Sequence, residues 1–506
     1  SNQPFDALII GAGISGLVAA VRLLESRPAA RLLVLEAKDR VGGRTLSTAL
    51  PSSGSGGTDW WDLGGQWVGD CQPRVCQLAE ELGIGRYQQF NEGRKLLQLA
   101  DGRVTNYSGE LPSIGLLGNL DLAQAIYRFE SRLSVSGRSS LVPEAAGSEP
   151  ASLPELPSDQ AILDGRTMST EAAGLCWTRN VRSLLDSTIR ILFGQEPAAV
   201  SALYAARMFH SVGDFERLIS DMPDGAQGYR LVGGAQSLSL RLADRLGPGR
   251  LRLGSPVAGV EEVEASSSAS ADAPDGGARL AVRLSSGDRL LARLVIAAVP
   301  PNQLARLALP SSEPAAVSLQ TAVGAAVPSH YAKFIVTYSE AWWRRLGYSG
   351  ELFSCDPLSP IVTGFDGTTD TGSAALVLLS AGRPSQDLEC LPTPEARREA
   401  VLRHLAKFFP HDSASGLAAD CLHFAEKFWR AEPFNGGCPS DVAPCGFGRF
   451  HLADLAAATA GLCDGRLLFA GTEFARRWVG YMEGAIESGE RAATAAATKL
   501  EDGQDG

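Results

Sequence analysis

Three glycines follow an apolar run close to the N-terminus. Leu8–Ile10 leads into Gly11, Gly13 and Gly16, and Glu36 ends a second apolar run 20 residues after the last glycine. Such glycines allow a tight turn, a close approach to a pyrophosphate and close helix–strand packing, while the acidic residue binds a ribose hydroxyl. The pattern predicts a dinucleotide site; a glycine-rich turn without a ligand is the alternative.

The residues directly after Glu36 favour FAD over a nicotinamide cofactor. They include two glycines and two arginines: Ala37, Arg40, Gly42, Gly43 and Arg44. Arginine supplies a planar donor fork with a permanent charge, and glycine lets backbone N–H groups reach an anion without steric conflict. A flavin diphosphate buried along its length needs such donors. FAD is therefore the expected cofactor.

Length and composition limit the class of protein. A chain of 506 residues is longer than a single hydrophobic core usually supports, so we expect two or more structural units. The net charge of -11 argues against a nucleic-acid partner, which requires a basic face, and does not help docking on anionic lipid. Nine cysteines without a CxxC motif indicate reduced thiols. The six histidines lack ligand spacing, so no metal site is expected.

The N-terminus and the hydropathy pattern bear on location. The chain enters its first apolar run within a few residues of Ser1, so we expect no signal peptide in this sequence. It contains no apolar run long enough to cross a membrane, for which about 18 residues are needed. We therefore expect a cytoplasmic or otherwise soluble intracellular protein, with no membrane anchor seen in this sequence; removal of a terminal anchor or targeting segment is the alternative.

The elements that must position these residues follow from hydrophobic periodicity. Apolar spacing predicts helices over residues 73–82, 171–192 and 397–409, and a β-hairpin from strands 280–284 and 290–299. Two stretches rich in small and polar residues, 136–158 and 265–277, are expected to be loops because they offer little apolar area to bury.

A second motif lies near the C-terminus. The apolar run Leu468–Ala470 ends at Gly471, Thr472 and Glu473, and the stretch Trp478–Ala485 opens a helix rich in small residues. A helix N-terminus of this kind can offer N–H donors to the electron-rich edge of a flavin. Close packing explains the alanines of this helix, but it does not explain Glu473 or the aromatic residues.

Together, the two motifs resemble the flavin-dependent monoamine oxidase family, and the similarity covers most of the chain. The segment 62–69 is similar to the family's stretch that passes the flavin ring, and 175–178 through 200–203 to its substrate-domain helices. Residues 229–234, 256–257 and 297–301 also resemble family segments.

The resemblance implies an α/β fold with a discontinuous architecture. A Rossmann-type FAD-binding domain, GR2/p-hydroxybenzoate hydroxylase-like, would comprise residues 1–75, 225–300 and 425–500. An interleaved α+β substrate domain would comprise 76–224 and 301–424, and 501–506 would form a flexible tail. Besides the glycine motif and its neighbours, the resemblance implies contacts to FAD from Ser15, Gly64, Gly65, Gln66, Trp67, Val257, Trp429, Cys438, Gly471, Thr472, Glu473, Gly480, Tyr481 and Met482.

Two positions would carry the chemistry. Lys333 matches the lysine that family members hold near flavin N5 through a water, although an outward lysine on an apolar strand is the alternative. Cys438 matches the cysteine that monoamine oxidases bond to the flavin 8α carbon, so covalent FAD is expected. Tyr481 matches one ring of an aromatic pair that guides the amine. The other ring is replaced by Pro439, so the pair is reduced to Tyr481 or rebuilt with Trp67 or Trp478.

The substrate pocket implied by the same resemblance is apolar. It would be lined by Trp67, Ile191, Leu192, Tyr204, Ser211, Thr363, Phe365 and Tyr481. Tyr204 and the nearby Phe209 could equally be core residues. The lack of acidic side chains in this set favours monoamines, because each ammonium of a polyamine needs a carboxylate partner when desolvated.

The expected reaction is oxidation of a primary, or secondary, monoamine to an imine, which hydrolyses to an aldehyde and ammonia, while dioxygen is reduced to hydrogen peroxide. The substrates are thus a small amine and dioxygen, and a homodimer is left open. An amino-acid oxidase, with Arg207 clamping a carboxylate, and a polyamine oxidase are alternatives on the same fold. A flavoprotein interaction module without turnover is the alternative outside enzymes.

Overall fold

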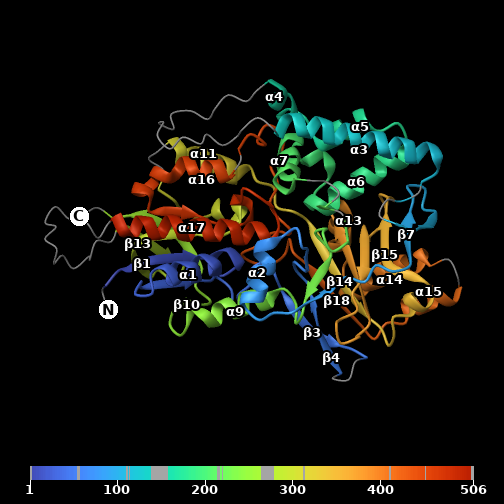
Figure 1. Cartoon of the computed structure of the whole chain (residues 1–506), viewed down its shortest axis with the longest axis horizontal. Coiled ribbons are helices and arrows are strands. Elements are labelled where there is room, and N and C mark those ends of the chain that lie inside the picture. Colours follow the sequence, from blue (N-terminus) through green and yellow to red (C-terminus); the bar gives the residue numbers. More distant parts are fainter. Residues whose placement is uncertain are drawn as a thin grey trace.

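The computed structural model describes residues 3–53, 57–109, 112, 114–137, 158–213, 217–218, 220–263, 279–310, 314–409, 412–450 and 452–502. It is a mixed α/β fold with two seven-stranded sheets, a three-stranded sheet and a two-stranded sheet. In Figure 1 the first large sheet, with β1 and β13, lies on the left beside α1 and α17, and the second, with β14 and β15, lies on the right. The helices α3, α5, α6 and α7 lie above the second sheet in this view.

The first sheet collects strands from both ends and the middle of the chain. Its order is β10–β2–β1–β13–β12–β11, with β19 also paired to β13. The strands are β1 (Phe5–Ile10), β2 (Leu32–Leu35), β10 (Leu251–Arg252), β11 (Val257–Glu262), β12 (Leu280–Leu284), β13 (Arg289–Ala297) and β19 (Leu467–Phe469). The central strand β1 pairs in parallel with β2 and β13 and ends in four buried residues, as expected of a strand covered on both faces.

Helices cover both faces of this sheet. One side carries α1 (Ile14–Ser26), α2 (Pro73–Glu81), α9 (Gln236–Leu246) and α17 (Met482–Asp502). The other carries α10 (Pro301–Leu304), α11 (Pro314–Ala325) and α16 (Leu452–Ala458). The helices α1 and α17 pack closely, because a Cβ at Gly489 would lie only 2.5 Å from the Ser15 carbonyl oxygen. The sequence predicts a flexible tail over residues 501–506. The helix α17 continues to Asp502, so residues 501 and 502 are helical instead.

The second sheet has the order β18–β14–β17–β16–β15–β7–β8. Its strands are β7 (Arg94–Gln98), β8 (Val104–Tyr107), β14 (Tyr331–Thr337), β15 (Tyr348–Ser354), β16 (Thr363–Asp366), β17 (Ala375–Ala381) and β18 (His423–Phe428). One face packs on α12 (Trp342–Arg345), α13 (Arg383–Glu389), α14 (Pro394–Phe408) and α15 (Asp412–Ala419). The opposite face meets Trp61 and Leu63, and Leu63 belongs to the segment 62–69 that was expected beside the flavin.

Two small sheets connect these parts of the molecule. The strands β3 (Ser47–Pro51) and β4 (Thr58–Asp62) pair with each other, and β9 (Tyr229–Leu231) lies between β5 (Trp67–Val68) and β6 (Arg86–Gln88). The remaining helices form a group of α3 (Leu116–Gly137), α4 (Ser158–Asp164), α5 (Met168–Leu175), α6 (Arg179–Phe193) and α7 (Ala202–Val212). Short 3-10 turns lie at Pro197–Ala199, Thr459–Gly465 and Thr472–Phe474.

The single helix predicted over 171–192 is wrong, because the chain forms two helices, α5 and α6. Residues between them turn toward the buried carboxylate of Asp121, which accepts hydrogen bonds from the N–H groups of Trp177 and Thr178 at 2.9 and 2.7 Å. The Thr178 side chain then caps α6 by accepting from the Val181 N–H. An N-cap residue has an extended backbone, so the helix has to restart there.

The other predicted elements are confirmed. The helix α2 begins at Pro73, α14 covers the predicted 397–409 almost completely, and β12 and β13 pair as an antiparallel hairpin. Of the expected loop 136–158, residues 136 and 137 end α3 and residue 158 begins α4, so these three are helical. Residues 138–157 and the expected loop 265–277 lie outside the described residues. All nine cysteines are free thiols. Within the described ranges, every helix is too short or too polar to cross a membrane.

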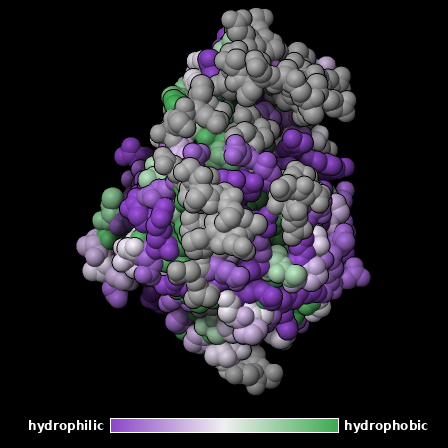
Figure 2. Space-filling model, turned by 90° about the vertical axis from the view of Figure 1, so that its left-hand side faces the viewer, coloured by the Kyte–Doolittle hydropathy of each residue, from purple (hydrophilic) through white to green (hydrophobic). Residues whose placement is uncertain are grey.

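The surface at the end of the molecule that carries the first sheet is largely hydrophilic. Figure 2 shows this end, where the described hydrophobic residues occur in small groups between hydrophilic ones. The excess of acidic over basic residues in the chain, 57 against 46, agrees with a well-hydrated surface.

Candidate active site

A cavity of about 310 Å³ begins at the carboxyl ends of β1 and β2 and extends toward the start of α17. Sixteen of the residues expected to contact FAD line it: Gly11, Gly13, Ser15, Glu36, Ala37, Gly42, Gly43, Arg44, Gly65, Val257, Cys438, Gly471, Thr472, Gly480, Tyr481 and Met482. These residues come from four separate parts of the chain. Parallel strands bring them together because their carboxyl ends meet at one edge of the sheet.

The turn between β1 and α1 has the geometry of an anion cradle. Gly11 has φ = +105°, and a Cβ there would lie 2.6 Å from the Ala298 carbonyl oxygen, so only glycine fits. Gly13 is the N-cap of α1, and no side chain caps this helix. A Cβ at Gly13 would project into open space, with only the Gly43 Cα at 4.0 Å. The uncapped helix N-terminus and this open space suit a pyrophosphate.

Glu36 lies at the other end of this cradle. Its carboxylate accepts hydrogen bonds from the N–H groups of Ala12 at 2.7 Å and Lys38 at 2.9 Å, which fixes the side chain at the end of β2. It is the only acidic side chain among the described residues that line the cavity. Glu36 and Val257 both line the cavity, so this end could hold the ribose and adenine of a nucleotide.

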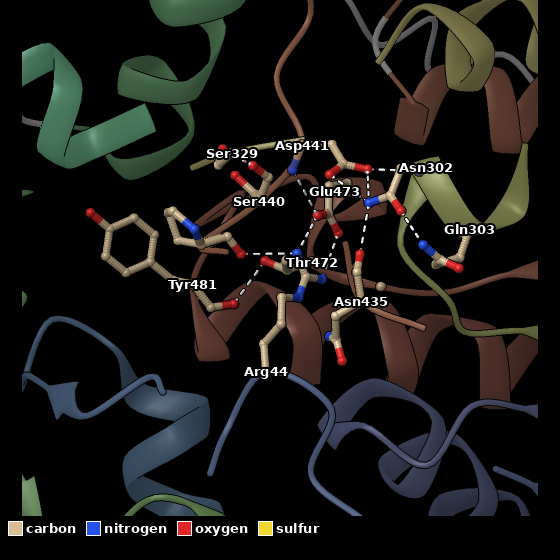
Figure 3. Close-up of polar contacts among 12 residues, drawn as sticks. Arg44, Asn302, Gln303, Ser329, Asn435, Ser440, Asp441, Thr472, Glu473 and Tyr481 are labelled. Carbon is tan, nitrogen blue, oxygen red and sulfur yellow. Dashed lines mark hydrogen bonds and ion pairs between the residues drawn. The ribbon is translucent and has the colours of Figure 1, made fainter. Parts of the chain in front are cut away.

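A buried ion pair connects the cradle to the segment that carries Cys438 (Figure 3). The guanidinium of Arg44 binds both carboxylate oxygens of Glu473, and it also donates to the Pro439 carbonyl at 2.9 Å. Asp441 accepts hydrogen bonds from the N–H of Asn302 at 2.7 Å and from its side-chain amide at 2.8 Å. Burial and the neighbouring Glu473 raise the pKa of Asp441 to about 6. The segment around Cys438 is thus held from both sides.

Lys333 lies on β14 and is almost completely buried. Its Nζ donates to the Gly64 carbonyl at 2.9 Å and to Oε1 of Gln66 at 2.6 Å, and it lies 5.1 Å from the Trp67 ring centroid. Burial lowers the pKa of Lys333 to about 7, against a smaller opposing effect of Asp62. An outward lysine on an apolar strand, the alternative from the sequence, does not fit this position.

Cys438 is buried at the cavity wall. Burial raises the pKa of its thiol to about 11, while Arg44 and Lys333 act in the opposite direction. Nearby, the rings of Tyr481 and Trp478 form an edge-to-face pair with centroids 5.1 Å apart. Trp67 makes a similar pair with Phe365 at 5.0 Å. The two candidate partners for Tyr481 therefore differ, because Trp478 contacts its ring and Trp67 packs elsewhere.

The residues expected to line the substrate pocket form two groups: apolar side chains that pack together, and hydroxyl groups that bind backbone carbonyls. Trp67, Ile191 and Phe365 pack together against the sheet face that carries Lys333, and Leu192 packs in the same core as Tyr481. By contrast, three polar side chains bind backbone groups: Tyr204 donates to the Asp441 carbonyl at 3.0 Å, Thr363 to Leu352 at 2.9 Å and Ser211 to Met208 at 2.7 Å. In the structure, these three hydroxyl groups stabilise the surrounding segments.

Several residues expected at the cofactor lie behind the cavity wall. Arg40 donates to the Gly43 carbonyl at 3.1 Å and to Glu432 at 2.8 Å, and the Trp429 indole donates to the Leu63 carbonyl at 2.8 Å. Gly16 and Gly64 allow close packing, because a Cβ would meet a backbone oxygen at 2.0 and 2.2 Å respectively. Arg207, the candidate clamp for a carboxylate, donates to the carbonyls of residues 448 and 449 and does not line the cavity.

Comparison with known proteins identifies the family. The sequence profile described as "flavin containing amine oxidoreductase" matches residues 14–497. The chain belongs to this family. The amine oxidase is 30% identical over 503 residues to amine oxidase [flavin-containing] A from Equus caballus, covering 97% of this chain and 85% of the horse enzyme. It is 29% identical over 495 residues to amine oxidase [flavin-containing] from Danio rerio, covering 96% and 85% of the two chains.

Solved structures agree with this assignment. Cyclohexylamine oxidase from Brevibacterium oxydans IH-35A has a TM-score of 0.82 and 29% identity, covering 98% of this chain and 100% of the other. Wild-type putrescine oxidase, solved with putrescine, has a TM-score of 0.79 at 24% identity, covering 97% and 98%, and shows the fold alone. The monoamine oxidase resemblance is confirmed, and this protein is a flavin-dependent amine oxidase that uses FAD.

The open space at Gly13 allows a test of the cofactor site. Replacing Gly13 by alanine should leave the apoprotein folded, because φ is -73° and the nearest atom to the new Cβ is 4.0 Å away. The methyl group would occupy the space for the pyrophosphate. In a Cys438→Ala background, which keeps FAD binding reversible, we therefore expect the Kd for FAD to rise at least tenfold, which is about 1.4 kcal/mol. Flavin fluorescence titration measures the Kd, and circular dichroism checks the fold.

Gly174→Ala is the matched control, since a Cβ on this helical glycine contacts nothing within 4 Å. It should leave the Kd for FAD unchanged. An unchanged Kd in Gly13→Ala would show that the cradle does not hold the pyrophosphate.

Proposed function

We propose that this amine oxidase converts primary, and secondary, monoamines to imines at a Rossmann-type FAD-binding domain, with dioxygen as the electron acceptor. The observation that carries the proposal is the position of Lys333. It lies buried against Gln66 and beside an apolar cluster that contains Trp67 and Phe365. FAD, when bound, supplies the two-electron chemistry, taking electrons from the amine and passing them to dioxygen. The imine then reacts with water to give an aldehyde and ammonia.

The chain's own residues would exclude water, orient the amine and control one proton. The apolar cluster keeps the site dry, which favours the neutral amine over its ammonium form. Lys333 has a pKa near 7, so Nζ can hold or release a proton at neutral pH while it remains bonded to Gly64 and Gln66. A thioether between Cys438 and the 8α carbon of FAD is also part of the proposal, since this thiol lines the cofactor cavity. Its formation would replace the S–H bond and one 8α C–H bond by a C–S bond, with two protons released and the electron pair passing through the flavin to dioxygen.

The strands support the proposed division into two domains. All seven strands of the first sheet come from residues 1–75, 225–300 and 425–500, which were assigned to the FAD-binding domain. The second sheet comes from 76–224 and 301–424, except that β18 extends across the proposed boundary to Phe428. We therefore retain the division and place β18 with the substrate domain.

Charge distribution supports a monoamine over a polyamine or an amino acid. None of the eight residues expected to line the substrate pocket is acidic, and Glu36, in the cofactor cavity, is already bound to two N–H groups. A second ammonium group would therefore lack a carboxylate partner. An amino-acid carboxylate would need a free arginine, yet Arg44 is paired with Glu473 and Arg207 binds backbone carbonyls.

The test is a ranking of kcat/KM by peroxide release for phenethylamine, tyramine, a straight-chain amine, putrescine, spermidine and several amino acids. We expect the monoamines to rank first, with kcat/KM rising with pH toward the pKa of the amine, because the neutral amine is the reactive form. Anaerobic bleaching of the flavin by the best amine checks that the cofactor is the acceptor. Spermidine or an amino acid in first place would contradict the proposed substrate class, and absence of bleaching would contradict turnover.

A further inference from the structure

Tyr331 lies two residues before Lys333 and shares its face of β14. Side chains alternate across a strand, so Tyr331, Lys333 and Ile335 point to one face of the sheet. Ile335 and Tyr331 belong to the apolar cluster that also contains Trp67 and Phe365. The intervening residues Ala332 and Phe334 pack on the opposite face. The ring of Tyr331 is therefore on the side of the sheet that carries the catalytic lysine.

The backbone before β14 runs beside the segment that carries Cys438. Val327 and Val442 exchange hydrogen bonds at 2.8 and 2.9 Å, and the Ser329 hydroxyl donates to the Ser440 carbonyl (Figure 3). A Cβ at Gly437 would lie 2.9 Å from the Ser329 nitrogen, so the two segments are in direct contact. This places the start of β14 next to Cys438, at the part of the cavity that Cys438 and Tyr481 line.

The Tyr331 hydroxyl group lacks a hydrogen-bond partner among the described residues. It also lies within electrostatic range of Cys438 and Tyr481, both of which line the cavity, and burial together with these two groups raises the pKa of the phenol. Tyr331 is half-buried, and its hydroxyl is not one of the enclosed polar atoms without a partner, so it reaches open space where water or a ligand can bind it. Since the cluster around it is apolar, a polar group of the substrate that displaces such a water would find its hydrogen-bond partner here.

We propose that the hydroxyl oxygen of Tyr331 accepts an N–H hydrogen bond from the neutral substrate amine and thereby positions the nitrogen. This inference rests on the proposed function, because it assigns a contact in the same substrate site. A primary amine has two N–H groups, a secondary amine one and a tertiary amine none. Tyr331 therefore favours amines that retain at least one N–H, a role that the sequence did not assign to it.

The test compares wild type with Tyr331→Phe, which keeps the ring and removes only the hydroxyl group. Anaerobic stopped-flow reduction with phenethylamine and N-methylphenethylamine gives the apparent Kd and the limiting rate of flavin reduction separately. We expect the Kd to rise about five- to tenfold, as for loss of one hydrogen bond, with a smaller change in the limiting rate. For N,N-dimethylphenethylamine, whose Kd is read from the perturbation of flavin absorbance, we expect no change.

Tyr348→Phe is the matched control, because it makes the same change on β15 in a core away from the cavity. It should leave every Kd unaltered. An unchanged Kd for the primary amine in Tyr331→Phe, or an equal rise for the tertiary amine, overturns the inference while the proposed function stands. If wild type releases no peroxide from any amine, the proposed function fails and the inference fails with it.

Discussion

Lys333→Met should keep FAD bound and slow flavin reduction, reoxidation by dioxygen, or both, by about 100-fold. Proton transfer by a positioned side chain contributes factors of this order. Methionine has a similar length but cannot hold a proton, and it leaves the Gly64 carbonyl and Oε1 of Gln66 without their donor. Stopped-flow spectroscopy measures both half-reactions. Lys407→Met, on the exposed side of α14, is the control and should behave as wild type.

The same variant should change the pH dependence of stability. The usual pKa of lysine is near 10.5, and burial lowers it to about 7 in the folded protein. Between these values the unfolded chain holds a proton at Lys333 that the folded chain has lost, so wild-type stability increases with pH across this window. Lys333→Met lacks this contribution. Its Tm relative to wild type should therefore be higher at pH 7 than at pH 9.

Unchanged rates in both half-reactions would remove Lys333 from the mechanism. A Tm difference that is the same at pH 7 and pH 9 would show that the lysine keeps its ordinary pKa in the folded protein. The two readouts are independent, because the first reports on the loaded enzyme and the second can be measured on the apoprotein.

Replacing Cys438 by alanine should make the flavin fully releasable: it should leave the protein when the protein is denatured. In wild type, we expect the yellow colour to stay with the protein after unfolding and filtration, because the thiol lines the cavity beside Tyr481. In the variant, the colour should pass into the filtrate. Absorbance of the two fractions, together with the intact mass of the protein, measures the covalent share directly.

Cys355→Ala provides the control, since Cys355 is also buried and its thiol also has a pKa raised by burial, to about 12. It lies in a different core and should retain the flavin as wild type does. Release of the whole flavin from wild type would show that no thioether forms, and that Cys438 only contributes to the cavity wall. The rest of the amine oxidase assignment would be unaffected by that result.

The sequence alone was sufficient to group the residues at the β1–α1 end of the cavity. Gly11, Gly13 and Glu36 follow each other within one strand–helix–strand unit, so their spacing directly reflects their positions in space. The helix α2 and the β12–β13 hairpin were predictable for the same reason, because periodicity and turn residues act over short distances. The single helix over 171–192 failed because Asp121, about 50 residues earlier, breaks it by accepting backbone N–H groups.

The tertiary structure decided which polar residues remain available for chemistry. Arg207, Ser211 and Thr363 have suitable side chains, but the fold uses them to bind backbone carbonyls. The sequence also missed Tyr331, although its spacing of two residues from Lys333 was a usable signal.

For Lys333, the sequence supplied the residue, and the packing of β14 against Gly64 and Gln66 supplied its burial. The packing of distant segments decides which hydrogen-bond partners a buried group finds. It also decides how far water is excluded around a charged group. Local sequence determines residue type and short-range geometry, whereas burial and pKa arise from contacts between segments hundreds of residues apart.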